Sequence, residues 1–186
     1  MPSIKSLFPG QQENEKICLI TRPHWMVLAG KILVWLIFVA ILLLTDWAVK
    51  NYLPFLAADP YASYVNLFKS IYFMFLILGL LIIWTIYYLN IQIVTNERIV
   101  DITQTSLLNH TVSELHLSRI EDVTSEVKGL LPTFLNYGNV YIQTAGEMER
   151  FVFDRIPDPG RLNKLILDLY EQLPDDQKRK NPREST

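Results

Sequence analysis

The sequence predicts two membrane-spanning helices followed by a mainly-β domain that ends in one amphipathic helix. The first observation is the stretch 70–89, SIYFMFLILGLLIIWTIYYL, which contains no charged residue. At a rise of 1.5 Å per residue, about 20 such residues cross a hydrocarbon core of about 30 Å. The hydrophobic period then changes from helix to strand after Asn90, and a single apolar helical stripe follows within 159–173. Half of the 186 residues are hydrophobic, and the excess is concentrated in 25–89.

A polar segment, 1–24, precedes the first predicted pass. Within it, residues 16–21 (KICLIT) are rich in β-forming side chains and either form a strand or lie along the membrane surface. The apolar run begins only after about 25 residues and is too long for the core of a cleaved signal peptide, so we expect a retained anchor. We place the first pass at 25–47, where Trp25 and Trp47 bracket the span as interfacial aromatic residues.

Lys31 lies inside this first pass, within two turns of its start. We interpret it as a snorkelling lysine, because its stem can follow the helix while its ammonium group reaches the headgroups. The alternative is an intramembrane charge that serves transport or a partner.

The second pass is predicted at 70–89, and residues 46–69 connect the two passes. Because the connection carries Pro54, Pro60 and several aromatic residues, we expect it to follow the membrane interface. Two passes leave both termini on one side of the bilayer. The basic residues near the membrane are Lys5, Lys16, Arg22 and Lys31 at the N-terminal end and Lys50 and Lys69 in the connection. This distribution favours both termini in the cytoplasm.

Alternating apolar and polar residues predict several short strands after the second pass. The predicted strands are 90–95, 98–103, 111–117, 120–127, 139–144 and 149–154. Residues 96–98 form a turn, and the Gly-containing connection 145–147 closes the last two strands into a hairpin. The stretch 130–137, which holds Pro132, is predicted to be a loop or a short helical turn.

One helix follows these strands. Asp158 suits its N-cap and Pro159 suits its first position. Its apolar positions, 162, 165, 166, 169, 170 and 173, follow helical spacing before Pro174 stops it. Antiparallel strands followed by one such helix predict a domain at 90–173, a small β-barrel or bent sandwich with the helix over an open end. The tail 174–186 is predicted to be disordered.

The order of these segments resembles a known family. The two passes are preceded by EKICLITR at 15–22 and followed by VTNERIVDIT, LLNHTVSELHLSRIEDVTSEVKGLL, YGNVYIQTAGE and ERFVFDRIPDP. Over residues 15–173 the chain resembles the bacterial pleckstrin-homology-like (PH-like) membrane proteins. The resemblance implies a seven-stranded, antiparallel, strongly bent sheet capped by a C-terminal helix. It also implies a bacterial plasma-membrane protein without enzymatic activity.

The charges argue against a lipid or nucleic-acid site of the basic kind. Eukaryotic PH domains that bind phosphoinositides use a Lys and Arg cluster around the first hairpin, whereas this hairpin offers Glu97 and Arg98. We therefore interpret Arg98 as a solvated or ion-paired turn residue. Residues 90–173 hold seven Lys plus Arg and twelve Asp plus Glu, a net charge of −5. A domain this acidic does not attract nucleic acid or anionic membranes through its bulk charge.

The sequence predicts no catalytic residue, cofactor site or metal site. His24 is remote from the other histidines, and His110 and His116 lie about 20 Å apart on a continuous strand. Cys18 is the only cysteine and is interpreted as a small apolar residue. Two acidic groups are interpreted as solvated faces rather than catalytic pairs: Glu121, Asp122 and Glu126, and Glu147, Glu149 and Asp154.

Two further stretches have competing interpretations. The apolar stretch 130–135 either packs under the barrel, which we expect, or stays exposed as a docking patch. The tail holds Lys178, Arg179, Lys180 and Arg183, but nearby acidic residues offset them, so we expect a solvated tail rather than a lipid contact.

The sequence thus favours a non-enzymatic, membrane-anchored PH-like domain that assembles with protein partners or with copies of itself. Side chains of the barrel and exposed strand edges would supply the contacts. One alternative is a domain that senses lipid headgroups at the cytoplasmic membrane surface. Another is a small subunit of a membrane transport or enzyme complex, for which Lys31 is the only candidate residue.

Overall fold

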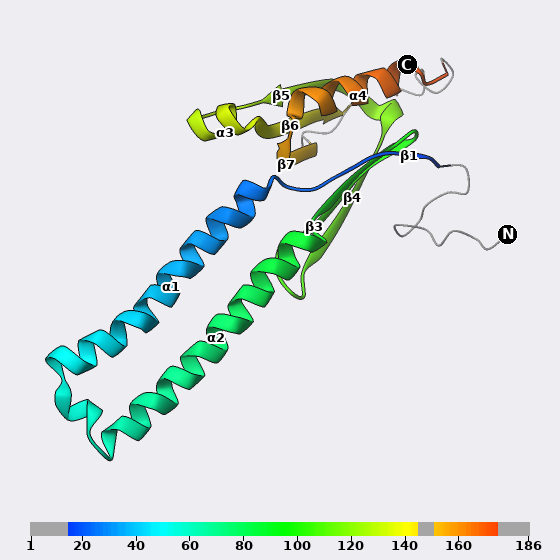
Figure 1. Ribbon diagram of the computed structural model, residues 1–186. Helices are drawn as coiled ribbons and strands as arrows, with labels where there is room; N and C mark the ends of the chain where they lie inside the picture. The colour runs from blue at the N-terminus through cyan, green and yellow to red at the C-terminus, as the bar shows by residue number, and fades with distance from the viewer. Residues whose placement is uncertain (1–14, 145–150, 175–186) are drawn as a thin grey trace. The chain divides into compact units, whose positions relative to one another are not determined.

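A computed structural model describes residues 15–144 and 151–174 (Figure 1). The chain divides into two compact units. The β-domain comprises the described parts of residues 1–24, 90–105 and 109–186. The helical hairpin comprises residues 25–89, with which residues 106–108 are grouped.

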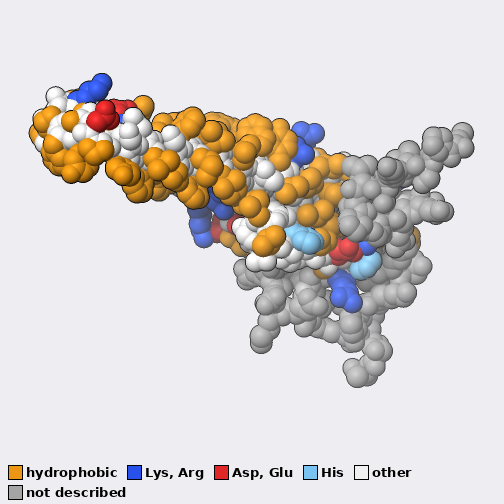
Figure 2. All heavy atoms as spheres, turned by 90° about the horizontal axis from the view of Figure 1, so that it is seen from below, with side chains coloured by type: hydrophobic (Ala, Val, Ile, Leu, Met, Phe, Trp, Pro, Cys, Tyr) orange, Lys and Arg blue, Asp and Glu red, His pale blue; other side chains and the backbone are white. Residues whose placement is uncertain are grey.

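The helical hairpin consists of two long apolar helices, α1 (Trp25–Tyr52) and α2 (Tyr61–Leu89), joined through the 3-10 helix η1 (Pro54–Ala57). Both helices are longer than the predicted passes 25–47 and 70–89, so the connection between them is shorter than expected. Each is long and apolar enough to cross a membrane, and the most apolar windows are 0% and 6% buried. Figure 2 shows hydrophobic side chains over most of this surface.

Aromatic side chains hydrogen-bond the two helices to each other. The indole nitrogen Nε1 of Trp35 donates to the carbonyl of Leu76 at 2.9 Å, and the Tyr72 hydroxyl donates to the carbonyl of Phe38 at 3.0 Å. Lys69 forms an ion pair with Asp46. These contacts hold the two antiparallel helices in one register.

The first sheet of the β-domain has four antiparallel strands in the order β1-β2-β3-β4. They are β1 (Ile17–Thr21), β2 (Ile91–Thr95), β3 (Arg98–Gln104) and β4 (His110–His116). The register pairs Thr21 with Gln92 and Leu19 with Val94, so β1 pairs with a strand that follows both helices. Residues 17–21 are therefore a strand, and the β-domain includes them in addition to the predicted 90–173.

The second sheet has three antiparallel strands in the order β5-β6-β7. After the 3-10 helix η2 (Leu117–Arg119) come β5 (Ile120–Glu126), the short helix α3 (Leu130–Leu135), β6 (Tyr137–Thr144) and β7 (Phe151–Pro157). A Cβ atom on Gly138 would lie 2.3 Å from the carbonyl oxygen of Glu126. The close approach of β6 to β5 therefore requires glycine at this position.

The last helix, α4 (Pro159–Glu171), begins as predicted at an Asp–Pro pair. Asp158 is the N-cap, and its carboxylate accepts a hydrogen bond from the backbone N–H of Arg161 at 3.2 Å. The apolar stripe of α4 faces the sheets. Leu162 and Ile166 are buried, and Leu165 and Leu169 pack against the same core.

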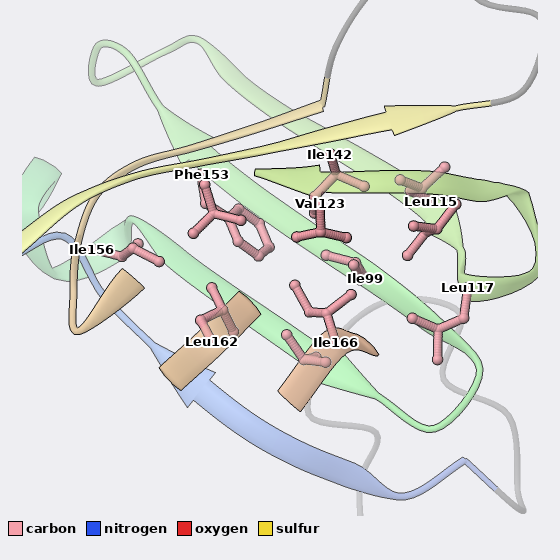
Figure 3. Packing of buried hydrophobic residues seen from close by; sticks show 12 residues of the cluster. Ile99, Leu115, Leu117, Val123, Ile142, Phe153, Ile156, Leu162 and Ile166 are labelled. Carbon is pink, nitrogen blue, oxygen red and sulfur yellow. The ribbon is translucent and has the colours of Figure 1, made fainter. Parts of the chain in front are cut away.

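The main core lies between the two sheets and α4 (Figure 3). Val94, Ile99, Val140, Ile142, Phe153, Ile156 and Ile166 are fully buried there. The strands of both sheets supply side chains with period 2, and α4 supplies them with helical period. This arrangement confirms the predicted mainly-β domain with a C-terminal helix.

Several sequence-based expectations have clear outcomes. Every predicted strand is present, and the bounds agree within two residues except that the last strand ends at Pro157, three residues later than predicted. Leu115 and Leu117 point inward, and α3 is the predicted short helical turn. The expectation that 130–135 packs under the barrel is wrong, because Leu130 and Phe134 are 82% and 86% exposed. The connection 145–147 and the tail from residue 175 lie outside the described residues.

The core packing predicts a large difference between neighbouring residues of α4. Ile166→Ala removes a fully buried side chain, and we expect it to lower the free energy of unfolding by about 2–5 kcal/mol. Leu167→Ala alters a side chain that is 41% exposed, and we expect less than half of that loss. Hydrogen–deuterium exchange of β6 and α4 peptides in the detergent-solubilised full chain measures both. Equal losses would contradict the inward orientation of Ile166.

Candidate interaction surface

A groove of the β-domain lies between β1 and the start of α4. It has a volume of about 390 Å³. Its lining residues are Cys18, Leu19 and Thr21 of β1, Ile156 and Pro157 of β7, and Asp158, Arg161, Leu162 and Leu165 at the start of α4. We call it the β1–α4 groove.

The β1–α4 groove combines an apolar floor with a charged rim. Leu19 and Leu165 are partly buried against the core and supply part of the floor. The side chains of Asp158 and Arg161 are exposed at the rim. Among the described strands only β2 pairs with β1, so β1 lies at the edge of its sheet. Backbone groups at a sheet edge are available to pair with another extended segment.

Arg98 does not point into solvent at the first hairpin. Its guanidinium is buried and binds Glu15 in a bidentate manner, Nε to Oε1 at 2.9 Å and Nη2 to Oε2 at 2.8 Å. Its third nitrogen, Nη1, donates to Oε2 of Glu114 at 2.5 Å. The hydrogen bonds that Arg98 donates to Glu15 raise the pKa of Arg98 further above its usual value. Of the two interpretations made from the sequence, the ion pair is correct and the solvated turn residue is wrong.

Because two carboxylates already bind Arg98, this position cannot serve as a phosphate site without breaking a buried ion pair. Glu97, the other charge of the turn, has the wrong sign for a phosphate. The described part of the first hairpin therefore lacks the basic cluster that a phosphoinositide site needs.

Polar groups also occur on the core side of the first sheet. Gln92 of β2 and Asp101 of β3 are register partners, and among the described residues no donor reaches Oε1 of Gln92 or Oδ1 of Asp101. Burial raises the pKa of the Asp101 carboxyl above its ordinary value, and a hydrogen bond from the Thr103 hydroxyl partly opposes this.

His24 packs within the β-domain. Its imidazole stacks on the ring of Tyr137 with centroids 4.7 Å apart, and its backbone N–H donates to the carbonyl of Arg155 at 2.6 Å. Burial lowers the pKa of His24. The other two histidines, His110 and His116, lie at opposite ends of β4.

The remaining candidates do not converge. No group of three or more His, Cys, Asp or Glu residues that could hold a metal occurs among residues 15–144 and 151–174. Of the acidic residues on β5, Glu121 and Asp122 are exposed and Glu126 pairs with Lys128. Asp154 is exposed on β7, whereas Glu147 and Glu149 lie outside the described residues. Lys31 is exposed on α1.

Comparison with known proteins assigns the family. The model of the bacterial PH domain family matches residues 25–170. The chain belongs to the bacterial PH domain family. A crystal structure of a DUF1696 family protein with a pleckstrin-homology domain, from Shewanella loihica PV-4, is also similar. It is 14% identical, with a TM-score of 0.36, and the similarity covers 44% of this chain and 70% of that chain. No curated protein matches.

The family assignment agrees with the resemblance seen in the sequence. Bacterial PH domains act in general as binding modules, and domains of this fold are generally non-catalytic. The family match begins at residue 25, so β1 lies outside it even though β1 forms the edge of the first sheet.

Sequence reasoning missed two parts of this bacterial PH domain, the β1–α4 groove and the identity of Glu15 as the partner of Arg98. Both depend on β1, and the residue pattern of 17–21 alone does not show which strand β1 pairs with. The one signal that could have found the groove is the alternation of 17–21 together with the apolar stripe of α4.

The Arg98 network predicts a large cost for removing one partner. Arg98→Met leaves the buried carboxylate of Glu15 without its guanidinium, and we expect a loss of about 3–5 kcal/mol in the free energy of unfolding. The double variant Glu15→Leu/Arg98→Met removes both charges, so we expect it to recover much of that loss. Hydrogen exchange of β1–β3 peptides in the full chain measures both variants. A loss below about 1 kcal/mol would mean that the pair is as weak as an exposed one.

Asp101 predicts a pH dependence. Its pKa is higher in the folded chain than in the unfolded chain, so above the unfolded pKa the native state binds more protons and its stability falls as pH rises. Asp101→Asn removes this titration. We expect the variant to be more stable than the wild type at neutral pH and equal to it below about pH 4, where the carboxyl is protonated in both states.

Thermal unfolding of the β-domain in the full chain, followed at several pH values, measures this difference. Asp168→Asn, at an exposed position on α4, is the matched control for the loss of one carboxylate. A stability gain for Asp101→Asn that did not vary with pH would contradict the assignment.

Proposed function

We propose that this chain is a non-enzymatic, membrane-anchored bacterial PH domain that binds an extended segment of a partner protein in the β1–α4 groove. The observation that carries the proposal is the groove itself, which joins the outer edge of β1, unpaired among the described strands, to an apolar floor and a charged rim. A partner segment would extend the first sheet beyond β1 and place alternate side chains against Leu19 and Leu165. Arg161 would bind an acidic group of the partner at the rim.

The helical hairpin supplies the proposed anchor. Its two helices are long and apolar enough to cross a bilayer, and most of their large apolar side chains are exposed. Since β1 and β2 flank the hairpin in sequence and pair with each other, two crossings return the chain to the side from which it left. We place the β-domain on the cytoplasmic side of a bacterial plasma membrane, because Lys16 and Arg22 precede the first pass.

The alternatives from the sequence receive less support. A headgroup sensor would need free basic residues, whereas Arg98 is held by Glu15 and Glu114. A transport or enzyme subunit would need polar groups that converge within the spans. Lys31 lies only seven positions into a 28-residue helix, close enough to its start to snorkel.

Crosslinking from Cys18 tests the proposed groove. Cys18 is the only cysteine of the chain, and it is exposed in the groove lining. A photoactivatable maleimide attached at Cys18 is expected to crosslink a partner in native membranes. Partial burial raises the pKa of this thiol, so labelling is done at mildly alkaline pH.

Two matched variants make the experiment specific. Leu165→Arg places a charge on the apolar floor, and we expect it to abolish the adduct. The same label at Leu167→Cys in a Cys18→Ser background lies on an exposed part of α4 outside the groove lining, and we expect no adduct. An adduct of twice the chain mass would identify a second copy as the partner. Equal adducts at positions 18 and 167, or an adduct that survives Leu165→Arg, would contradict the proposed site.

A further inference from the structure

The short helix α3 exposes a compact apolar surface. Leu130, Leu131 and Phe134 are 82%, 62% and 86% exposed, and their spacing of i, i+1 and i+4 places them on one side of a helical turn. We call these three residues the α3 face. Isolated exposed apolar residues are ordinary, but three large ones on one turn indicate a surface that something covers.

The α3 face is held in place by the strands beneath it. Gly129, at φ 106°, begins the helix, and Asn136, at φ 50°, ends it in the left-handed region. The carbonyl of Asn136 accepts a hydrogen bond from the backbone N–H of Asp158 at 2.8 Å, and Gly138 lies tight against Glu126. The helix is therefore fixed to the second sheet at its base, and its apolar side chains are exposed in a defined position in the chain by itself.

The base of α3 is tied to the segment that leads into the first apolar helix. Tyr137 directly follows Asn136, and its ring stacks on His24. The backbone of His24 is also bound to Arg155 of β7. The next residue in the chain is Trp25, the first residue of α1. If α1 crosses a bilayer, its first residue lies at the interface, and one peptide bond and one stacked ring pair connect that residue to Tyr137 at the base of α3.

We propose that the α3 face inserts into the interfacial layer of the bilayer that α1 and α2 cross. This inference rests on the membrane anchoring in the proposed function. Leucine and phenylalanine side chains at this depth exchange water for the boundary between headgroups and acyl chains. The inserted face would give the β-domain a second attachment to the membrane, besides the covalent one.

The charges near α3 indicate apolar insertion rather than recognition of anionic headgroups. Lys128, two residues before the helix, pairs with Glu126 at 2.5 Å. The six residues of α3 itself carry no charge. We therefore expect insertion into vesicles of neutral phosphatidylcholine and no dependence on salt.

Depth-dependent quenching tests the proposal on the full chain reconstituted in phosphatidylcholine vesicles. In a Cys18→Ser background, an environment-sensitive fluorophore is attached at Phe134→Cys, at Leu167→Cys or at Phe38→Cys. Phe38 is exposed on α1 and reports whether the hairpin lies in the bilayer, whereas Leu167 is exposed on α4 and reports on another surface of the β-domain. Shallow nitroxide lipids quench from the interfacial layer, and iodide quenches from water.

The expected result is a blue shift and loss of fluorescence with nitroxide lipids at positions 134 and 38, with no such loss at position 167. Salt should leave the signal at 134 unchanged. Quenching at 38 together with iodide quenching at 134 would overturn the α3 inference while leaving the anchor intact. If the label at position 134 were shielded from both quenchers, the α3 face would be covered by a second copy of the chain, and the inference of membrane insertion would be overturned as well. Absence of lipid quenching at 38 would refute the membrane anchor itself and, with it, this inference.

Discussion

Glu15 and Arg98 meet across 83 positions of sequence, at the edge where β1 pairs with β2. The pairing of β1 with β2 fixes the backbone at this edge. Separating Glu15 from Arg98 would leave a buried charge without its partner, so any arrangement that separates them is destabilised. Thr95 adds to the same point, because its hydroxyl donates to Glu15 and accepts from the backbone of Arg98. Without β1, the first sheet would lose its edge strand and the β1–α4 groove would lose one wall. The groove therefore depends on residues that precede the two helices.

The β-domain after residue 90 was readable from the sequence because its signals are local. Period-2 alternation marks the strands, an Asp–Pro pair marks the start of α4, and helical spacing marks the side of α4 that packs on the sheets. The two long helices were readable from composition alone, although their ends were not. Composition defines the apolar core of a helix, whereas its end is set by capping and by the connection that follows.

The candidate surfaces were harder to predict from the sequence because they depend on residues that are far apart in the chain. Five residues at 17–21 contain nothing that says whether another strand will pair with them. The burial of Arg98 follows from Glu15 and Glu114, which come from two different strands or segments. The α3 face was expected to pack inward because its residues are apolar. Hydrophobicity reports the cost of exposure to water, and it does not distinguish a protein core from another apolar surrounding.

The insertion of the helical hairpin between β1 and β2 also sets the order in which the chain can fold during synthesis. Thr21 and its register partner Gln92 are separated by all of α1 and α2. At a typical rate of about 5–20 residues per second, β2 emerges several seconds after β1. During that interval β1 has no native partner, and the carboxylate of Glu15 remains in water. Pairing within the first sheet therefore cannot begin until β2 has emerged, and from then on β1 is available to pair with it while β3 and β4 follow. A nascent chain whose synthesis stops within the hairpin would carry an unpaired β1 without the strand β2 that β1 pairs with.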